Sequence, residues 1–135
     1  MPNTAPRKVT GVLIDVWNET AEIKTLTADL DAYYEALNCT TIAITSRRIG
    51  PRGRKYYDII CDDEGLLVAP TKISAVDSMG RPQLVGNLFI CSHDKDGNEI
   101  SLTDTEAKRI MREVHITPTR AYPHGYPMLH NVKYT

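Results

Sequence analysis

The chain has 135 residues and a formal net charge of −1, with 24% charged and 41% hydrophobic residues. A chain of this length is the size of one ordinary domain and can bury roughly two-thirds of its unfolded surface. The near-neutral charge excludes a general nucleic-acid coat, and no stretch approaches the roughly 20 apolar residues of a membrane span. Residues 1–8 lack the apolar run of a signal peptide. We therefore expect a cytoplasmic domain without membrane contact.

The cysteines and histidines show no metal-binding pattern. Cys39, Cys61 and Cys91 are far apart in apolar surroundings, without the paired spacing of a zinc site or a disulfide scaffold. We interpret them as reduced core residues. The four histidines lack i, i+4 spacing, so the sequence predicts no metal and no cofactor.

A hairpin is predicted at the start of the domain. Residues 9–16 predict a strand inside a sheet because apolar residues occupy both of its faces. One face holds Val12, Ile14 and Val16, and the other holds Val9 and Leu13. Residues 21–26 are more polar and predict a hairpin partner nearer an edge of the sheet.

A helix is predicted next, capped by Thr27 and running to about Leu37, with Asp29 near the positive end of its dipole. Its apolar stripe follows i, i+3, i+4, i+7 spacing and comprises Leu30, Tyr33, Tyr34 and Leu37. The two tyrosines could form a stacking platform, but this spacing favours packing against the sheet.

The densest charge of the chain lies between two further predicted strands. Residues 40–45 and 56–61 are rich in β-branched or aromatic side chains and predict an antiparallel hairpin. Its tip would carry the cations, because residues 46–57 contain five cations and no acidic residue. Guanidinium groups bind phosphate or carboxylate bidentately, and an aromatic ring can stack on a base. The candidate ligand-binding residues are Arg47, Arg48, Arg52, Arg54, Lys55 and Tyr56, with Lys72 as a secondary candidate.

The rest of the domain predicts more sheet and a second helix. An acidic turn at 62–65 precedes a connection, 66–82, that the pattern does not assign. Residues 83–92 predict a strand, 94–99 a polar turn and 100–102 a short return. Thr103 to Glu106 form a capping box that opens a helix with a buried stripe. That stripe comprises Ala107, Ile110, Met111 and Val114.

The predicted architecture is an α+β single domain, a mainly antiparallel sheet with two packed helices and an extended C-terminal arm. It divides into a leader, residues 1–8, a domain, residues 9–114, and the arm, residues 115–135. The arm is rich in proline, histidine and tyrosine, and its aromatic content favours packing over disorder.

Catalytic signals are weak throughout. The Gly50–Gly53 tip lacks P-loop spacing, and Asp94-x-Asp96-Gly97 lacks the remaining ligands of a calcium loop. Asp58, Asp62 and Asp63 show no base or acid partner in the sequence. We therefore expect a protein that is not an enzyme. The basic hairpin itself could be a solvated loop that keeps a sheet edge soluble.

Several motifs resemble a small uncharacterised domain family found in bacteriophages and bacterial mobile elements. They are the Asp-Glu-Gly turn at 62–65, the Val-Gly strand around 85–86 and the Ser-Leu-Thr helix entry at 101–103, and the resemblance covers about residues 9–114. It implies an accessory protein acting in the host bacterial cytoplasm and transfers no catalytic residue. Family members usually have a short, weakly charged connection where this chain has residues 47–55, so the added arginines direct attention to that segment.

The leading hypothesis is a non-enzymatic protein that binds an anionic, nucleotide-derived ligand through the basic hairpin and sequesters a bacterial defence signal. One alternative is a protein–protein inhibitor or adaptor that docks on a host protein through the hairpin or the arm. Another is nucleic-acid binding, which predicts affinity that falls steeply with salt. Edge strands and an aromatic arm also allow a homo-oligomer.

Overall fold

The computed structural model describes residues 7–18, 20–49, 55–64, 73–76, 82–116 and 129–131. Within these ranges the chain forms strands and two helices in one domain. The strands are β1 (Lys8–Asp15), β2 (Thr20–Thr27), β3 (Ile42–Ile49), β4 (Tyr57–Asp62), β5 (Ile73–Val76), β6 (Pro82–Val85), β7 (Leu88–His93), β8 (Glu99–Ile100) and β9 (Leu129–Asn131). The helices are α1 (Leu30–Leu37) and α2 (Asp104–Ile116).

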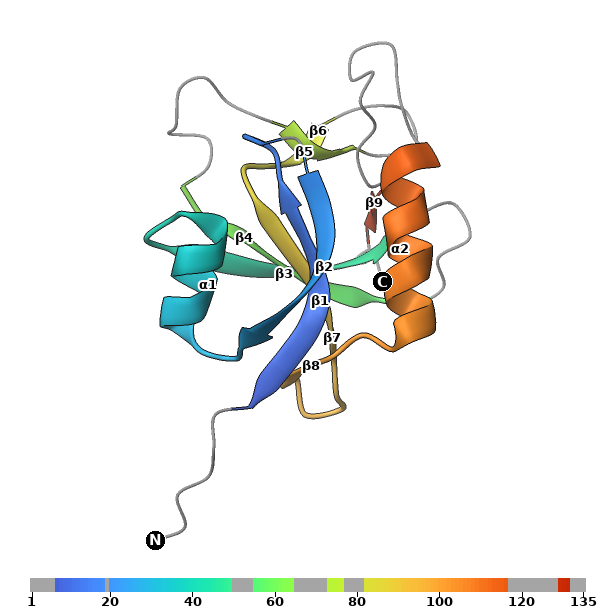
Figure 1. Cartoon of the computed structure of the whole chain (residues 1–135), viewed down its shortest axis with the longest axis horizontal. Helices are drawn as coiled ribbons and strands as arrows, with labels where there is room; N and C mark the ends of the chain where they lie inside the picture. The colour runs from blue at the N-terminus through green and yellow to red at the C-terminus, as the bar shows by residue number, and fades with distance from the viewer. Residues whose placement is uncertain are drawn as a thin grey trace, which may run out of the picture.

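A single antiparallel sheet organises the molecule. Its strands follow the order β2-β1-β7-β4-β3-β9, β8 pairs with β7, and β5 and β6 form a separate two-stranded sheet. The helices α1 and α2 lie on opposite sides of the main sheet (Figure 1). The predicted α+β architecture with two packed helices is therefore confirmed. No helix in the described part of the chain is long and apolar enough to cross a membrane.

The central strand β1 has two buried faces, as its alternating pattern predicted. Val12 and Ile14 pack in the core on the α2 side, whereas Val9 and Leu13 pack in the core on the α1 side. Neighbouring residues of a strand point to opposite faces, so one apolar strand can fill two cores. Full burial of each such side chain contributes about 1.5–3 kcal/mol. The edge position predicted for the second strand is confirmed, because β2 ends the sheet.

Helix α1 begins later than the sequence predicted. Asp29 is its N-cap, and its carboxylate accepts a hydrogen bond from the backbone N–H of Ala32 at 2.8 Å. Thr27 is instead the last residue of β2, because its backbone pairs with Lys8. The expected buried stripe is also corrected, since Leu30 is 55% exposed. The predicted end of the helix at Leu37 is confirmed.

The strand predicted at 83–92 is divided in two. β6 ends at Val85 and β7 begins at Leu88, and Gly86 between them has a φ of 78°. This left-handed conformation favours glycine and breaks the strand. Asn87 is buried there, and its side-chain oxygen accepts a hydrogen bond from the N–H of Val16 at 2.9 Å. This hydrogen bond therefore links the start of β7 to the end of β1.

The hairpin of β3 and β4 is longer than predicted. β3 runs to Ile49, with Arg47 facing Tyr57 in the antiparallel register. Arg47 and Arg48 therefore lie within the strand and not in the turn. β9 pairs with the same end of β3, so this part of the predicted arm adds a strand to the sheet. The remainder of the arm lies outside the described residues.

The predicted capping box at the start of α2 is confirmed. The Thr103 N–H donates to Glu106 Oε1 at 2.9 Å, and the Glu106 N–H donates to Thr103 Oγ1 at 3.1 Å. Ala107 and Ile110 are buried against the sheet as expected. The helix continues to Ile116, and the side chain of Val114 lies outside the described residues.

Candidate functional site

The three predicted basic residues that the structure describes, Arg47, Arg48 and Lys55, do not all lie on one surface. Arg47 and Arg48 are neighbours in β3, so their side chains leave opposite faces of the sheet. Arg47 shares the α2 face with its partner Tyr57, and its Nε donates to Thr45 Oγ1 at 3.2 Å. Arg52, Arg54 and Lys72 lie outside the described residues.

On the α2 face, the end of the hairpin is tied to the second helix. Glu106 Oε2 accepts hydrogen bonds from Lys55 Nζ and from the Tyr57 hydroxyl, both at 2.9 Å. Arg109 Nη1 donates to the backbone oxygen of Ile49 at 2.9 Å. Lys55 also lies over the Tyr57 ring, with its nitrogen 5.4 Å from the ring centroid. These contacts are structural, because they hold Lys55 against a carboxylate of the same chain.

The carboxyl group of Glu106 is strongly held in its ionised form. Burial raises the pKa of Glu106, but the Thr103 N–H, Lys55 and Tyr57 outweigh that effect and lower the pKa to about 2. Burial raises the pKa of Tyr57, so its hydroxyl stays protonated and donates. The tie therefore persists at neutral pH.

Arg48 lies on the other face, which α1 only partly covers. Its guanidinium carbon is 5.9 Å from the ring centroid of Tyr56, and that ring is 41% exposed. The Arg48 Nε is buried and has no hydrogen-bond partner among the described residues. Ile44, on the same face of β3, is 49% exposed. A cationic donor without an acceptor thus lies beside an accessible aromatic ring.

A carboxylate and an imidazole lie next to this pair. Asp58 faces Ser46 across β3 and β4, which places both on the Arg48 face. His93 Nδ1 is 3.0 Å from Asp58 Oδ1. Burial raises the pKa of Asp58, and His93 opposes that shift. We name this surface the open sheet face; it comprises Ile44, Ser46, Arg48, Tyr56, Asp58 and His93.

The open sheet face presents the Arg48 guanidinium, and the cysteine beside this face is not reactive. Cys91 faces Asp58 across β4 and β7, yet burial raises the pKa of its thiol to about 12. Within the described ranges no group of three or more histidine, cysteine or acidic residues could hold a metal ion. Arg48 and Tyr56 were predicted from the sequence, whereas Asp58 and His93 were not assigned to this surface. Asp58 is two residues after Tyr56 and so lies on the same face, and the pairing of β7 with β4 brings His93 to that face.

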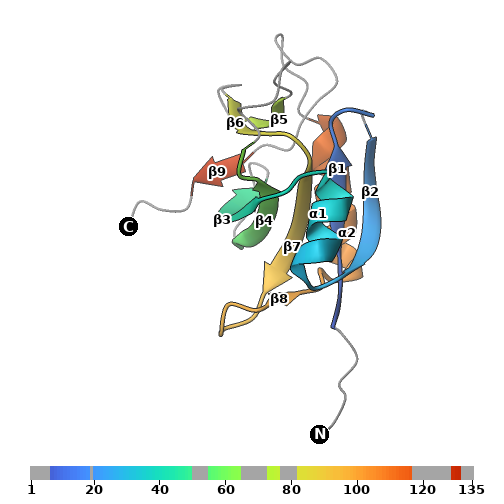
Figure 2. The same ribbon diagram turned by 90° about the vertical axis from the view of Figure 1, so that its left-hand side faces the viewer.

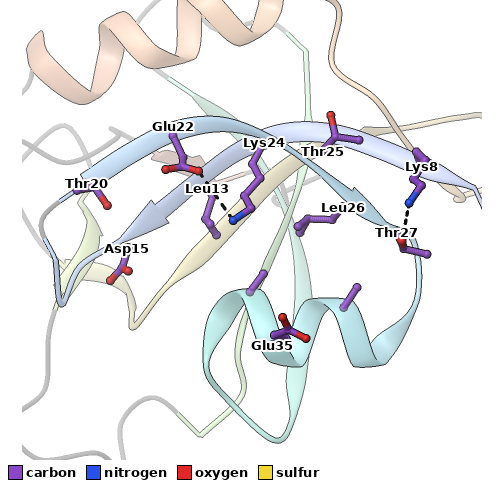
Figure 3. A pocket seen from close by; sticks show the side chains of 12 residues that line it. Lys8, Leu13, Asp15, Thr20, Glu22, Lys24, Thr25, Leu26, Thr27 and Glu35 are labelled. Atoms are coloured by element: carbon purple, nitrogen blue, oxygen red, sulfur yellow. Dashed lines mark hydrogen bonds and ion pairs between the residues drawn. The ribbon is translucent and has the colours of Figure 1, made fainter.

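A concavity of about 430 Å³ lies between β2 and α1, away from the open sheet face (Figure 3). Its floor includes Leu13 and Leu26, and its rim mixes both signs of charge. The charged residues that line it are Lys8, Lys24, Asp15, Glu22 and Glu35. None of the predicted ligand-binding residues that the structure describes lines this concavity, so it is not the predicted site.

The comparison with known families agrees with this architecture. A family described as "Domain of unknown function (DUF3846)" matches residues 9–115. The chain belongs to the DUF3846 family. The DUF3846 match spans the open sheet face, and it confirms that the resemblance is to an uncharacterised domain family. No curated protein and no solved structure matches the chain.

Proposed function

We propose that this DUF3846 protein is a non-enzymatic binding protein that takes an anionic, nucleotide-derived ligand on its open sheet face. The observation that supports the proposal is the Arg48 guanidinium, whose buried Nε has no acceptor among the described residues and which lies beside the exposed Tyr56 ring. A buried donor without an acceptor is costly, and a ligand phosphate oxygen would satisfy it.

The neighbouring side chains suit the remainder of such a ligand. Tyr56 offers ring surface on which a base can stack, and stacking of this kind tolerates any base. Ile44 adds exposed apolar surface on the same face. The Asp58–His93 pair supplies polar groups for a sugar or base edge. Arg52 and Arg54 of the adjoining hairpin segment remain sequence-based candidates for further phosphate contacts.

The biological setting follows from the resemblance noted in the sequence. An accessory protein of a bacteriophage or mobile element in the bacterial cytoplasm would gain from capturing a nucleotide-derived defence signal. Capture without turnover needs only binding groups, which agrees with the proposal that the protein is not an enzyme.

Native mass spectrometry of the protein purified from bacteria tests the proposal. We expect a bound mass in the wild type that is lost in Arg48→Ala and reduced in Tyr56→Ala. Arg112→Ala is the matched control, because Arg112 is exposed on α2 and its removal changes the net charge equally. An unliganded wild type that also fails to bind added nucleotides in calorimetry would refute the proposal.

The alternative functions give different results in the same experiment. Nucleic-acid binding would appear as affinity for a single-stranded oligonucleotide that falls steeply between low and moderate salt. Docking on a host protein would leave the purified chain unliganded and insensitive to nucleotides. Deleting the arm does not separate these functions cleanly, because β9 pairs with the backbone of Arg47 to Ile49. Side-chain substitutions are therefore the better test.

A further inference from the structure

Within the described parts of the chain, strand β2 pairs with another strand on one side only. It is eight residues long and ends the main sheet, with β1 as its strand partner among the described residues. Figure 2 shows β2 at the outer margin of the molecule, beyond β1. An edge strand of this length presents a row of free N–H and C=O groups that can pair with another strand. β2 is thus a potential interface.

The side chains of β2 divide between the two faces of the sheet. Ile23 faces Val12, a residue of the α2-side core, and is therefore on the α2 face, where it is 43% exposed. Glu22 and Lys24 are on the opposite face, and both are exposed. Their charged atoms are 4.0 Å apart along the strand, a weak contact at the surface.

The order of Glu22 and Lys24 along β2 allows two antiparallel copies of the strand to place opposite charges face to face. In an antiparallel pair of two β2 strands centred on Ile23, Glu22 of each copy is directly opposite Lys24 of the other. Two carboxylate–ammonium pairs then form on one face, and the two Ile23 side chains meet on the other. Directly opposed unlike charges stabilise an antiparallel strand pair.

The neighbouring registers are disfavoured. A symmetric antiparallel pair has its two-fold axis at a facing pair of identical residues, because facing residues point to the same side of the sheet. An axis at Glu22 opposes two carboxylates, and an axis at Lys24 opposes two ammonium groups. Like charges directly opposite are destabilising. The charge pattern therefore selects the register centred on Ile23.

We propose that the protein forms a two-fold symmetric dimer in which the β2 strands of two copies pair antiparallel about Ile23 and join the two sheets into one. Glu22 and Lys24, which form the charge pairs of this interface, also line the concavity between β2 and α1 (Figure 3). The open sheet face takes no part in the contact, so each copy keeps its own.

Sedimentation velocity over about a hundredfold range of protein concentration measures the association. We expect a reversible dimer for the wild type. Lys24→Glu and Glu22→Lys each turn both charge pairs from attractive to repulsive, so each raises the dissociation constant on the order of tenfold to a hundredfold. Lys95→Glu is the matched control, because it makes the same charge change in the exposed turn before β8. It should leave the dimer intact.

Two restorations make the test specific. The double variant Glu22→Lys plus Lys24→Glu exchanges the two charges and should dimerise like the wild type. A mixture of the two single variants should form a heterodimer, because a chain with two lysines then faces a chain with two glutamates. A wild type that stays monomeric, a Lys24→Glu variant that remains as dimeric as the wild type, or a mixture that does not associate would each overturn the proposal.

Discussion

Replacement of Glu106 by glutamine should loosen the tie between the β3–β4 hairpin and α2. Glutamine can still close the capping box with Thr103, so the substitution removes chiefly the charge that Lys55 and the Tyr57 hydroxyl meet. The side chain of Glu106 is only 18% exposed, so solvent does not replace that interaction fully. We expect Glu106→Gln to destabilise the fold while leaving α2 formed.

The pKa of Glu106 gives the magnitude. A shift of the Glu106 pKa from its ordinary value of 4.5 to about 2 corresponds to about 3 kcal/mol of stability that depends on the charge. Glutamine keeps the hydrogen bond from the Thr103 N–H, and Lys55 is itself half exposed, so the expected loss is smaller, about 2 kcal/mol near pH 7. Because the pKa is lower in the folded state, this stability is present above the unfolded pKa and disappears as the pH falls toward 2.

Urea unfolding at several pH values measures the effect. The difference between wild type and Glu106→Gln should be greatest near neutral pH and should lose more than half of its size by about pH 3. Asp104→Asn is the matched control, because it removes a carboxylate from the same helical turn, where Asp104 pairs with Lys108 at the surface. It should cost no more than about 0.5 kcal/mol. Equal stability of Glu106→Gln and wild type at neutral pH, or a loss that does not change with pH, would refute the reasoning.

Two further substitutions test the packing of the sheet. Gly11→Ala should destabilise the fold by about 3 kcal/mol, because a Cβ at this position would overlap the backbone oxygen of Ile90 and meet the Phe89 ring at 2.8 Å. A melting temperature equal to that of the wild type would contradict that close approach. Asn87→Ala should cost about 1–3 kcal/mol in urea unfolding, because the buried N–H of Val16 loses its acceptor. A variant as stable as the wild type would mean that this hydrogen bond contributes nothing net.

Local patterns were sufficient wherever neighbouring residues decide the structure. The two-faced alternation of β1, the polar edge strand β2 and the capping box at Thr103 were all predicted correctly. Each depends on contacts within a few residues or on a periodicity that a buried strand imposes. The start of α1 was predicted wrongly, since pairing with Lys8 extends β2 through Thr27 and leaves Asp29 as the cap.

The sequence by itself determined the fold class, the position of most strands and the concentration of cations between residues 46 and 57. Only the tertiary structure decided how those cations are used. Because β3 extends to Ile49, Arg47 and Arg48 lie within the strand and point to opposite faces of the sheet. The docking of α2 places Glu106 beside Lys55, which is 51 positions earlier in the chain. The physical reason is that strand register and helix docking are set by packing of the whole core. The density of charge along the chain does not say on which face of the sheet each charged side chain will lie.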